Sequence, residues 1–331
     1  MRFFTPSLLF ITVALGTACN QTPSDPAQED KSGRYTTFPI TSLSSQLPSG
    51  FAKFFAKEID VFGVKILATA ETQDVKIRHA AHILAEYLDN DEDGKADNAR
   101  VLQSMLNYRA MLLMAPTGVE FENMFERMVD EIPEERNMIL QSLYGEETHP
   151  DGAANNRFDF AYEEVLHLVT HAGYSRAYPD AFGEHPDTKL TRAMDVARGG
   201  HFQNLPKRYP KDAWYTYYDS TCEYECQATE YLYWGLTSLL GAQDLPGRLE
   251  QIQDEWRLNT KEKLRTGDKL LFKLLTDPQY QLPKVLPDGN YRQLPASRLK
   301  TQLVLKLESG VVIFGDEARA DYVPIVGVDQ E

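Results

Sequence analysis

The chain has 331 residues, of which 42% are hydrophobic, 25% charged and 11% aromatic. This composition supplies enough apolar material for a folded core and excludes a disordered or fibrous chain for most of its length. The 49 acidic residues outnumber the 34 basic ones and give a formal net charge of −15. Nucleic-acid binding depends on clustered Lys and Arg, which the sequence lacks, so we expect no nucleic-acid partner.

The N-terminus has the pattern of a secretory signal peptide, because Arg2 precedes an apolar run and small residues follow up to Cys19. Residues 15–19 resemble a bacterial lipobox, although Gly16 stands where that pattern prefers Leu. The resemblance implies a signal peptide over residues 1–18 and a lipid on Cys19 that anchors the protein to a membrane. We therefore expect a protein of the cell envelope, on the periplasmic face or at the cell surface, with plain secretion as the alternative.

Residues 19–35 are polar and rich in Pro and Ser, which predicts a flexible tether. After it, the hydrophobic periodicity predicts strands that alternate with helices, and then mainly helices. We expect an α+β fold, with a mixed α/β lobe over 36–155 and a mainly helical lobe over 156–331 that share an interface. The predicted elements, in chain order, are strand 64–69, helices 73–88 and 101–110, strand 111–115, helix 121–131, strand 137–144, and helices 158–174, 188–198, 225–241, 247–263 and 268–275.

Carboxylates alternate along the loop that follows the first predicted helix, and Gly94 stands at the sixth position of this loop. The pattern resembles a calcium loop of the EF-hand or dockerin kind, in which alternate side chains turn inward to supply oxygens to a hard cation. Arg100 stands at position twelve, where an EF-hand has Glu, and a solvated acidic turn is the alternative. The implied ligands are Asp89, Asp91, Asp93, Lys95 through its carbonyl, and Asp97.

A second polar group lies in an otherwise apolar helix. His167 and His171 are one turn apart, a spacing that lets an α-helix offer two nitrogens to one transition metal. Glu163 and Glu164 flank the same stripe one turn earlier. Burying these groups unpaired costs several kcal/mol, so we expect them to coordinate a metal, pair with Arg or Tyr from elsewhere, or face a cleft.

This helix resembles the metal-binding helix of zincin metallopeptidases, which carries His-Glu-x-x-His between an N-terminal sheet and a helical lobe. Leu168 follows the first histidine where a zincin has its general-base Glu, and Glu164 is the nearest substitute. Glu230, on a later helix, resembles the downstream Glu ligand of the gluzincin branch. The resemblance implies zinc bound by His167, His171 and Glu230, with Glu164 as the catalytic base and a zincin-like order of elements.

Three other patterns occur in the sequence. Glu164-x-x-His167 is half of a di-iron motif, but the sequence has no second copy on another predicted helix. With Cys19 lipidated, Cys222 and Cys226 remain as an even pair, which predicts a disulfide in an oxidising compartment. The acidic loop together with the Glu-Glu-Val-Leu-His run also resembles a group of uncharacterised secreted bacterial proteins, which implies no activity.

Two functions follow from these patterns. The first is an extracytoplasmic metal-dependent hydrolase, peptidase-like, with a structural calcium and a peptide or glycan substrate. The second is a non-catalytic, calcium-stabilised binding or scaffold lipoprotein of the envelope, in which the Glu/His stripe is a buried polar network or a non-catalytic metal site.

Overall fold

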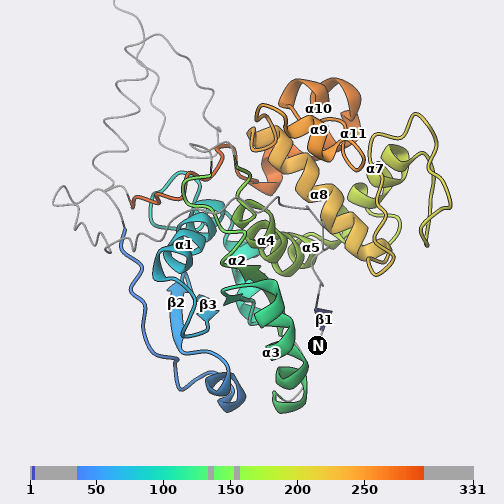
Figure 1. Ribbon diagram of the computed structural model, residues 1–331. Helices are drawn as coiled ribbons and strands as arrows, with labels where there is room; N and C mark the ends of the chain where they lie inside the picture. Colours follow the sequence, from blue (N-terminus) through green and yellow to red (C-terminus); the bar gives the residue numbers. More distant parts are fainter. Residues whose placement is uncertain (1, 4–35, 133–137, 153–156, 294–331) are drawn as a thin grey trace, which may run out of the picture. The chain divides into compact units, whose positions relative to one another are not determined.

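The computed structural model describes residues 2–3, 36–132, 138–152 and 157–293 (Figure 1). Cys19, the tether at 19–35 and most of the predicted signal peptide lie outside these residues. The described residues group into one compact unit. This unit has the α+β fold that the sequence predicts.

A mixed sheet lies at the centre of the N-terminal half. Strands β2 (Lys57–Val61) and β3 (Val64–Ala68) form an antiparallel hairpin, and β4 (Met111–Ala115) and β5 (Ile139–Tyr144) extend the sheet parallel to β3 in the order β5-β4-β3-β2. The residues that join β2 to β3 have φ of 53° and 93°, the backbone of a two-residue hairpin turn. The short β1 (Arg2–Phe3) pairs with β5 but belongs to the predicted signal peptide, so we expect the mature protein to keep the other four strands.

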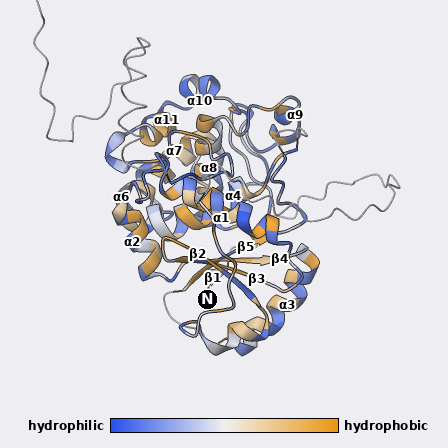
Figure 2. Ribbon diagram, turned by 90° about the vertical axis from the view of Figure 1, so that its left-hand side faces the viewer, coloured by the Kyte–Doolittle hydropathy of each residue, from blue (hydrophilic) through white to orange (hydrophobic). Residues whose placement is uncertain are grey.

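Helices cover both faces of this sheet (Figure 2). All five residues of β4 are buried, and its successive side chains point to opposite faces. One set packs on the side of α3 (Gly118–Glu131), and the other faces α1 (Asp74–Leu88), α2 (Ala99–Asn107) and α4 (Ala161–Leu168). A strand buried on both faces is a continuous apolar run in the sequence, which explains why β4 could be predicted.

The second half of the described chain is helical, as predicted, and one apolar core joins it to α1 and α4. None of the described helices combines the length and apolar character needed to cross a membrane. The predicted disulfide between Cys222 and Cys226 is present at the start of α8, with Cα atoms 5.3 Å apart. The remaining elements are η1 (Ser49–Lys53), η2 (Val169–Tyr174), α5 (Ser175–Ala177), α6 (Pro179–Phe182), α7 (Lys189–Arg198), α8 (Tyr224–Leu240), α9 (Arg248–Ile252), α10 (Lys261–Gly267), α11 (Lys269–Leu275) and η3 (Pro278–Tyr280).

Candidate metal centre

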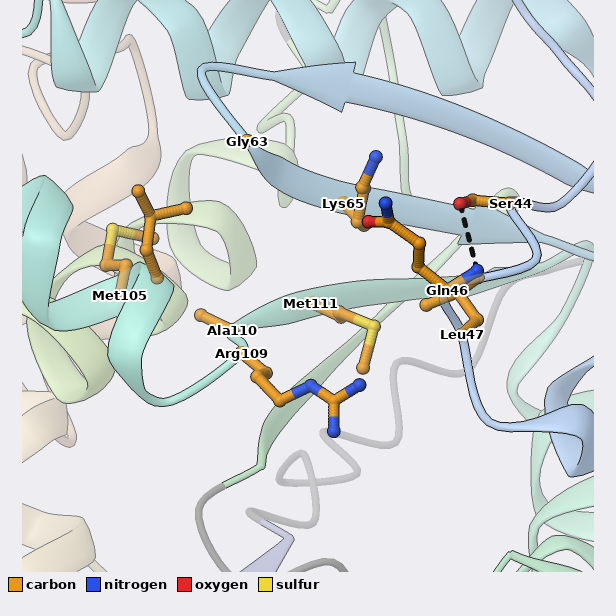
Figure 3. A pocket seen from close by; sticks show the side chains of 10 residues that line it. Ser44, Gln46, Leu47, Gly63, Lys65, Met105, Arg109, Ala110 and Met111 are labelled. Atoms are coloured by element: carbon orange, nitrogen blue, oxygen red, sulfur yellow. Dashed lines mark hydrogen bonds between the residues drawn. The ribbon is translucent and has the colours of Figure 1, made fainter.

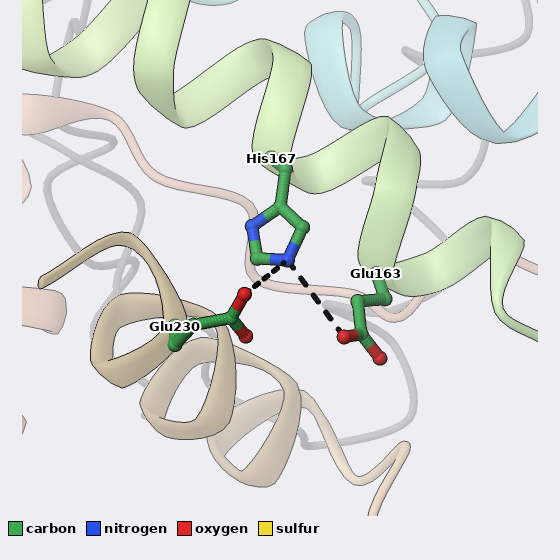
Figure 4. Close-up of side chains that lie close together, drawn as sticks. All are labelled: Glu163, His167 and Glu230. Atoms are coloured by element: carbon green, nitrogen blue, oxygen red, sulfur yellow. Dashed lines mark ion pairs between the residues drawn. The ribbon is translucent and has the colours of Figure 1, made fainter. Parts of the chain in front are cut away.

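Three polar side chains from α4 and α8 meet in one group, which we call the His167 cluster (Figure 4). The Nε2 atom of His167 lies 3.6 Å from Oε1 of Glu230 and 3.8 Å from Oε1 of Glu163. Glu163 and His167 stand one turn apart on α4, and Glu230 reaches them from α8. Donor atoms of all three lie within 4.8 Å of one another.

The spacing of the His167 cluster suits a bound cation better than a hydrogen-bonded pair. Both ring nitrogens of His167 lack a hydrogen-bond partner among the described residues, although only 6% of the residue is exposed. Hydrogen bonds to nitrogen are about 2.7–3.2 Å long, which is shorter than both distances to the carboxylates. Ligands of a tetrahedral zinc stand about 3.4 Å apart, because each lies about 2.0–2.2 Å from the ion. The two distances from the ring to the carboxylates are therefore close to the spacing of zinc ligands.

The acidic and basic groups of the His167 cluster shift the pKa values of one another. Burial lowers the pKa of His167, but the carboxylates of Glu230, Glu163 and Glu164 outweigh burial and raise it. Burial raises the pKa of Glu230, and the neighbouring His167 offsets this only in part.

His171 lies outside the cluster. Its Nδ1 is 2.7 and 2.8 Å from the two carboxylate oxygens of Glu184, which also accepts a hydrogen bond of 2.8 Å from the hydroxyl of Thr229. The helix becomes π-helical at Val169, with hydrogen bonds to the fifth residue instead of the fourth. The four-residue spacing rule of an α-helix therefore fails across this boundary, and His171 is separated from the other predicted zinc ligands.

Glu164 faces the sheet. Its Oε2 accepts a hydrogen bond from the side-chain amide of Gln141 on β5. Burial raises the pKa of Glu164 well above its usual range, and the charge of His167 opposes this. Glu163, the neighbour of Glu164 in the sequence, is the carboxylate that reaches His167. The i, i+4 spacing of Glu163 and His167 is the signal by which the sequence indicates this pair.

Glu255, which the sequence analysis missed, also neighbours the cluster. It lies after α9 and is partly exposed. Burial and the charge of Glu163 raise the pKa of Glu255 to about 7, against the opposing charge of Arg248. The charge of Glu255 in turn raises the pKa of Glu230. No sequence motif marks Glu255, because it comes from an irregular segment far along the chain.

The predicted calcium loop follows α1 and gathers three of its aspartates. Asp89, Asp91 and Asp97 bring carboxylate oxygens within 4.8 Å of one another. Asp89 is fully buried, and its Oδ2 accepts a hydrogen bond of 2.7 Å from the amide of Gly94. The φ of Gly94 is 89°, a conformation that glycine adopts without steric cost. Burial and the charge of Asp91 raise the pKa of Asp97 to about 6, although the amide of Asn90 opposes them.

The other residues of the predicted loop are not part of this group of three carboxylates. Asp93 accepts the amide of Lys95 at 2.9 Å through Oδ1. The guanidinium of Arg100, at position twelve, lies 4.5 Å from the centroid of the Tyr178 ring. The loop therefore offers three gathered carboxylates, and no acidic side chain stands at its twelfth position.

Hydrogen bonds join the loop to the segment 284–292. The side-chain oxygen of Asn90 accepts the amides of Lys284 and Val285 at 2.8 and 2.9 Å, and its nitrogen donates to the carbonyl of Val285 at 2.9 Å. The hydroxyl of Tyr291 donates to Oδ2 of Asp89 at 2.5 Å. The most buried carboxylate of the loop is thus bonded to the last part of the described chain.

A separate small cavity lies at the β2–β3 hairpin (Figure 3). Leu47, Met105 and Met111 are among its apolar lining residues, and Lys65 and Arg109 are its charged ones. The amine of Lys65 is already paired with two carboxylates, at 2.8 and 2.7 Å. No residue of the His167 cluster or of the calcium loop lines this cavity, so it is distinct from the candidate metal centre.

Comparisons with protein-family models, with curated proteins and with solved structures find no match for this chain. The resemblances to zincins and to EF-hand loops therefore stay predictions. The function is inferred from the geometry of the site.

Proposed function

We propose that the protein is an extracytoplasmic metal-dependent hydrolase of peptide-like amides, in which Glu163, His167 and Glu230 hold a divalent metal, zinc in the first place. The observation that carries this proposal is the buried His167 ring. Its nitrogens have no hydrogen-bond partner among the described residues, while two carboxylate oxygens stand 3.6 and 3.8 Å from Nε2. Imidazole and carboxylate are zinc ligands, and three protein ligands are the number found in catalytic zinc sites.

The chemistry of the proposed site is hydrolytic. A divalent metal held there supplies a Lewis acid that polarises a carbonyl and lowers the pKa of water towards neutrality. Glu255 accepts the proton of the attacking water, because it neighbours Glu163 and Glu230 without belonging to the cluster. As the water oxygen bonds to the carbonyl carbon and the C–N bond breaks, Glu255 returns the proton to the leaving nitrogen. Glu164, buried and bonded to Gln141, is less suited to this role.

The test compares two isosteric variants of neighbouring carboxyls. Metal-free protein is loaded with zinc, and its metal content and its hydrolysis of a mixed peptide library are measured. We expect one zinc per chain, and we expect Glu255→Gln to keep the zinc but to lower turnover about 100-fold or more, because the amide cannot accept a proton. Glu164→Gln is the matched control, since an amide has nearly the shape of the carboxyl and its oxygen can still accept the hydrogen bond from Gln141.

The outcomes separate the alternatives. Loss of turnover in Glu164→Gln alone would assign the proton transfer to Glu164. Wild-type protein that binds no zinc, manganese or iron and stays folded in strong chelator would remove the hydrolase proposal. It would favour a non-catalytic binding or scaffold role, with the cluster as a buried polar network.

We also propose that the protein is lipid-anchored in the envelope through Cys19. Cys19→Ser is expected to move the protein from the membrane fraction to the soluble fraction or to leave it unprocessed, because acyl chains contribute about 0.8 kcal/mol per buried methylene. Fractionation with an antibody, together with mass spectrometry of the mature N-terminus, measures this. Cys226→Ser, which changes another cysteine, is the control, and equal fractionation of Cys19→Ser and wild type would point to plain secretion.

The third part of the proposal is a structural calcium ion at the loop after α1. It is supported by the three gathered carboxylates of Asp89, Asp91 and Asp97 and by the turn at Gly94. Oxygen ligands on a turning loop suit calcium, and weak calcium sites are found in extracellular modules, where the ion is abundant.

A further inference from the structure

Arg248 is a buried cation that is held by neutral groups. Only 8% of the residue is exposed, and its guanidinium carbon lies 3.9 Å from the centroid of the Phe158 ring and 5.9 Å from that of Trp234. Its Nε donates to Oε1 of Gln243 at 2.8 Å, and its Nη1 donates to Oε1 of Gln251 at 3.3 Å. Arg248 forms no ion pair with a carboxylate of the described residues.

A buried guanidinium without a counter-ion destabilises a fold unless something compensates its charge. The two glutamine amides orient the group, and the charge of Glu255 acts on it from beyond the distance of an ion pair. Its Nη2 makes no hydrogen bond within the part of the chain that the structure describes. The planar fork of arginine matches the two oxygens of a carboxylate, which makes a carboxylate-bearing ligand its natural partner.

Two side chains, Gln243 and Tyr233, connect Arg248 to the His167 cluster. The amide nitrogen of Gln243 donates to the hydroxyl of Tyr233 at 3.0 Å while its oxygen accepts from Arg248. The ring of Tyr233 packs against His167, with centroids 5.5 Å apart. The guanidinium also lies close enough to oppose the rise in the pKa of Glu255. A continuous chain of contacts therefore joins the cation to the cluster.

We propose that Arg248 binds a carboxylate of the substrate beside the metal centre, so that the preferred substrates are amides that carry a free carboxylate near the scissile bond. This inference rests on the proposed hydrolase function, because the bound carboxylate belongs to a substrate only if the protein is a hydrolase. The binding of a carboxylate by Arg248 can be measured without turnover and without metal. The phenyl and indole rings beside Arg248 hold the guanidinium in place through cation–π contacts.

The test uses a matched pair of probes, N-benzoylglycine and N-benzoylglycinamide, which differ in one carboxylate. Their binding to zinc-loaded and to metal-free protein is measured by calorimetry. We expect wild type to prefer the carboxylate about tenfold or more in both forms, since a charge-assisted bond to a buried guanidinium is involved. Arg248→Gln is expected to bind both probes equally while keeping its zinc content.

Two controls separate the outcomes. Arg248→Lys keeps the positive charge but lacks the two-pronged guanidinium, so we expect a reduced preference for the carboxylate probe. This variant replaces Arg248→Gln if Arg248→Gln does not fold. A preference that Arg248→Gln retains would overturn the inference, and it would assign the carboxylate to the metal if it is retained in the zinc-loaded form alone. Equal binding of both probes by wild type would also overturn the inference. A preference that depends on Arg248 in protein that binds no metal would support the anion site and remove only the hydrolase.

Discussion

His167→Ala is expected to abolish zinc binding, whereas His171→Ala is expected to leave it intact. His167 supplies the only nitrogen of the proposed ligand set, and the two carboxylates left behind lie on different helices, α4 and α8. Loss of a residue that merely supports a ligand lowers metal affinity by about 10–100-fold, so loss of a ligand should exceed about 100-fold. The zinc dissociation constant, measured by competition with a chromogenic chelator, gives the result.

His171→Ala serves as the matched control because it removes the same side chain one turn later. It deprives the buried carboxylate of Glu184 of one of its partners, so we expect a loss of about 1–3 kcal/mol in the free energy of unfolding with unchanged zinc affinity. Zinc should raise the melting temperature of wild type and of His171→Ala, but not that of His167→Ala. Zinc lost from His171→Ala and kept by His167→Ala would contradict the assignment and restore the spacing-based site.

The elements that could be predicted are those whose burial follows a simple period. β4 is a run of five buried residues, and α8 extends over nearly the predicted range of 225–241. The predicted helix at 247–263 is wrong, because the chain leaves α9 at Ile252 and enters α10 only at Lys261. Between them Trp256 is buried and its indole nitrogen donates to Ser238 at 2.9 Å. This tertiary contact outweighs a helical periodicity that is local.

Residues of the candidate site could be predicted only where they follow α-helical spacing or where they are single charged side chains in apolar helices. Glu230 was identified as the single acid among aromatic residues, and the structure brings it to His167. The position of His171 could not be foreseen, since the π-helical turn that displaces it has no clear signature in the sequence. Glu255 and Arg248 both lie in the segment 247–263, whose local periodicity says nothing about distant neighbours, so only the fold relates them to the cluster.

Calcium is expected to stabilise the protein through the loop after α1. A ligand that binds only the folded state stabilises it by mass action. With a dissociation constant of about 0.1–1 mM, as in extracellular modules, 10 mM calcium should contribute about 1.4–2.7 kcal/mol to the free energy of unfolding. The melting temperature of chelator-treated protein, measured with and without calcium, reports this gain. Magnesium is the companion ion, and we expect it to have a smaller effect because it demands a tighter octahedral site.

Asp91→Asn combined with Asp97→Asn should abolish the gain, because the amides keep the shape of the side chains but remove two of the three gathered charges. Asp288→Asn removes an exposed negative charge from the adjacent segment 284–292 and should leave the response to calcium intact. Because Tyr291 donates its hydroxyl to Asp89, calcium should also slow amide hydrogen exchange in that segment of the wild-type protein. An unchanged melting temperature of wild type in 10 mM calcium would leave the loop as an acidic turn, stabilised only by its own hydrogen bonds.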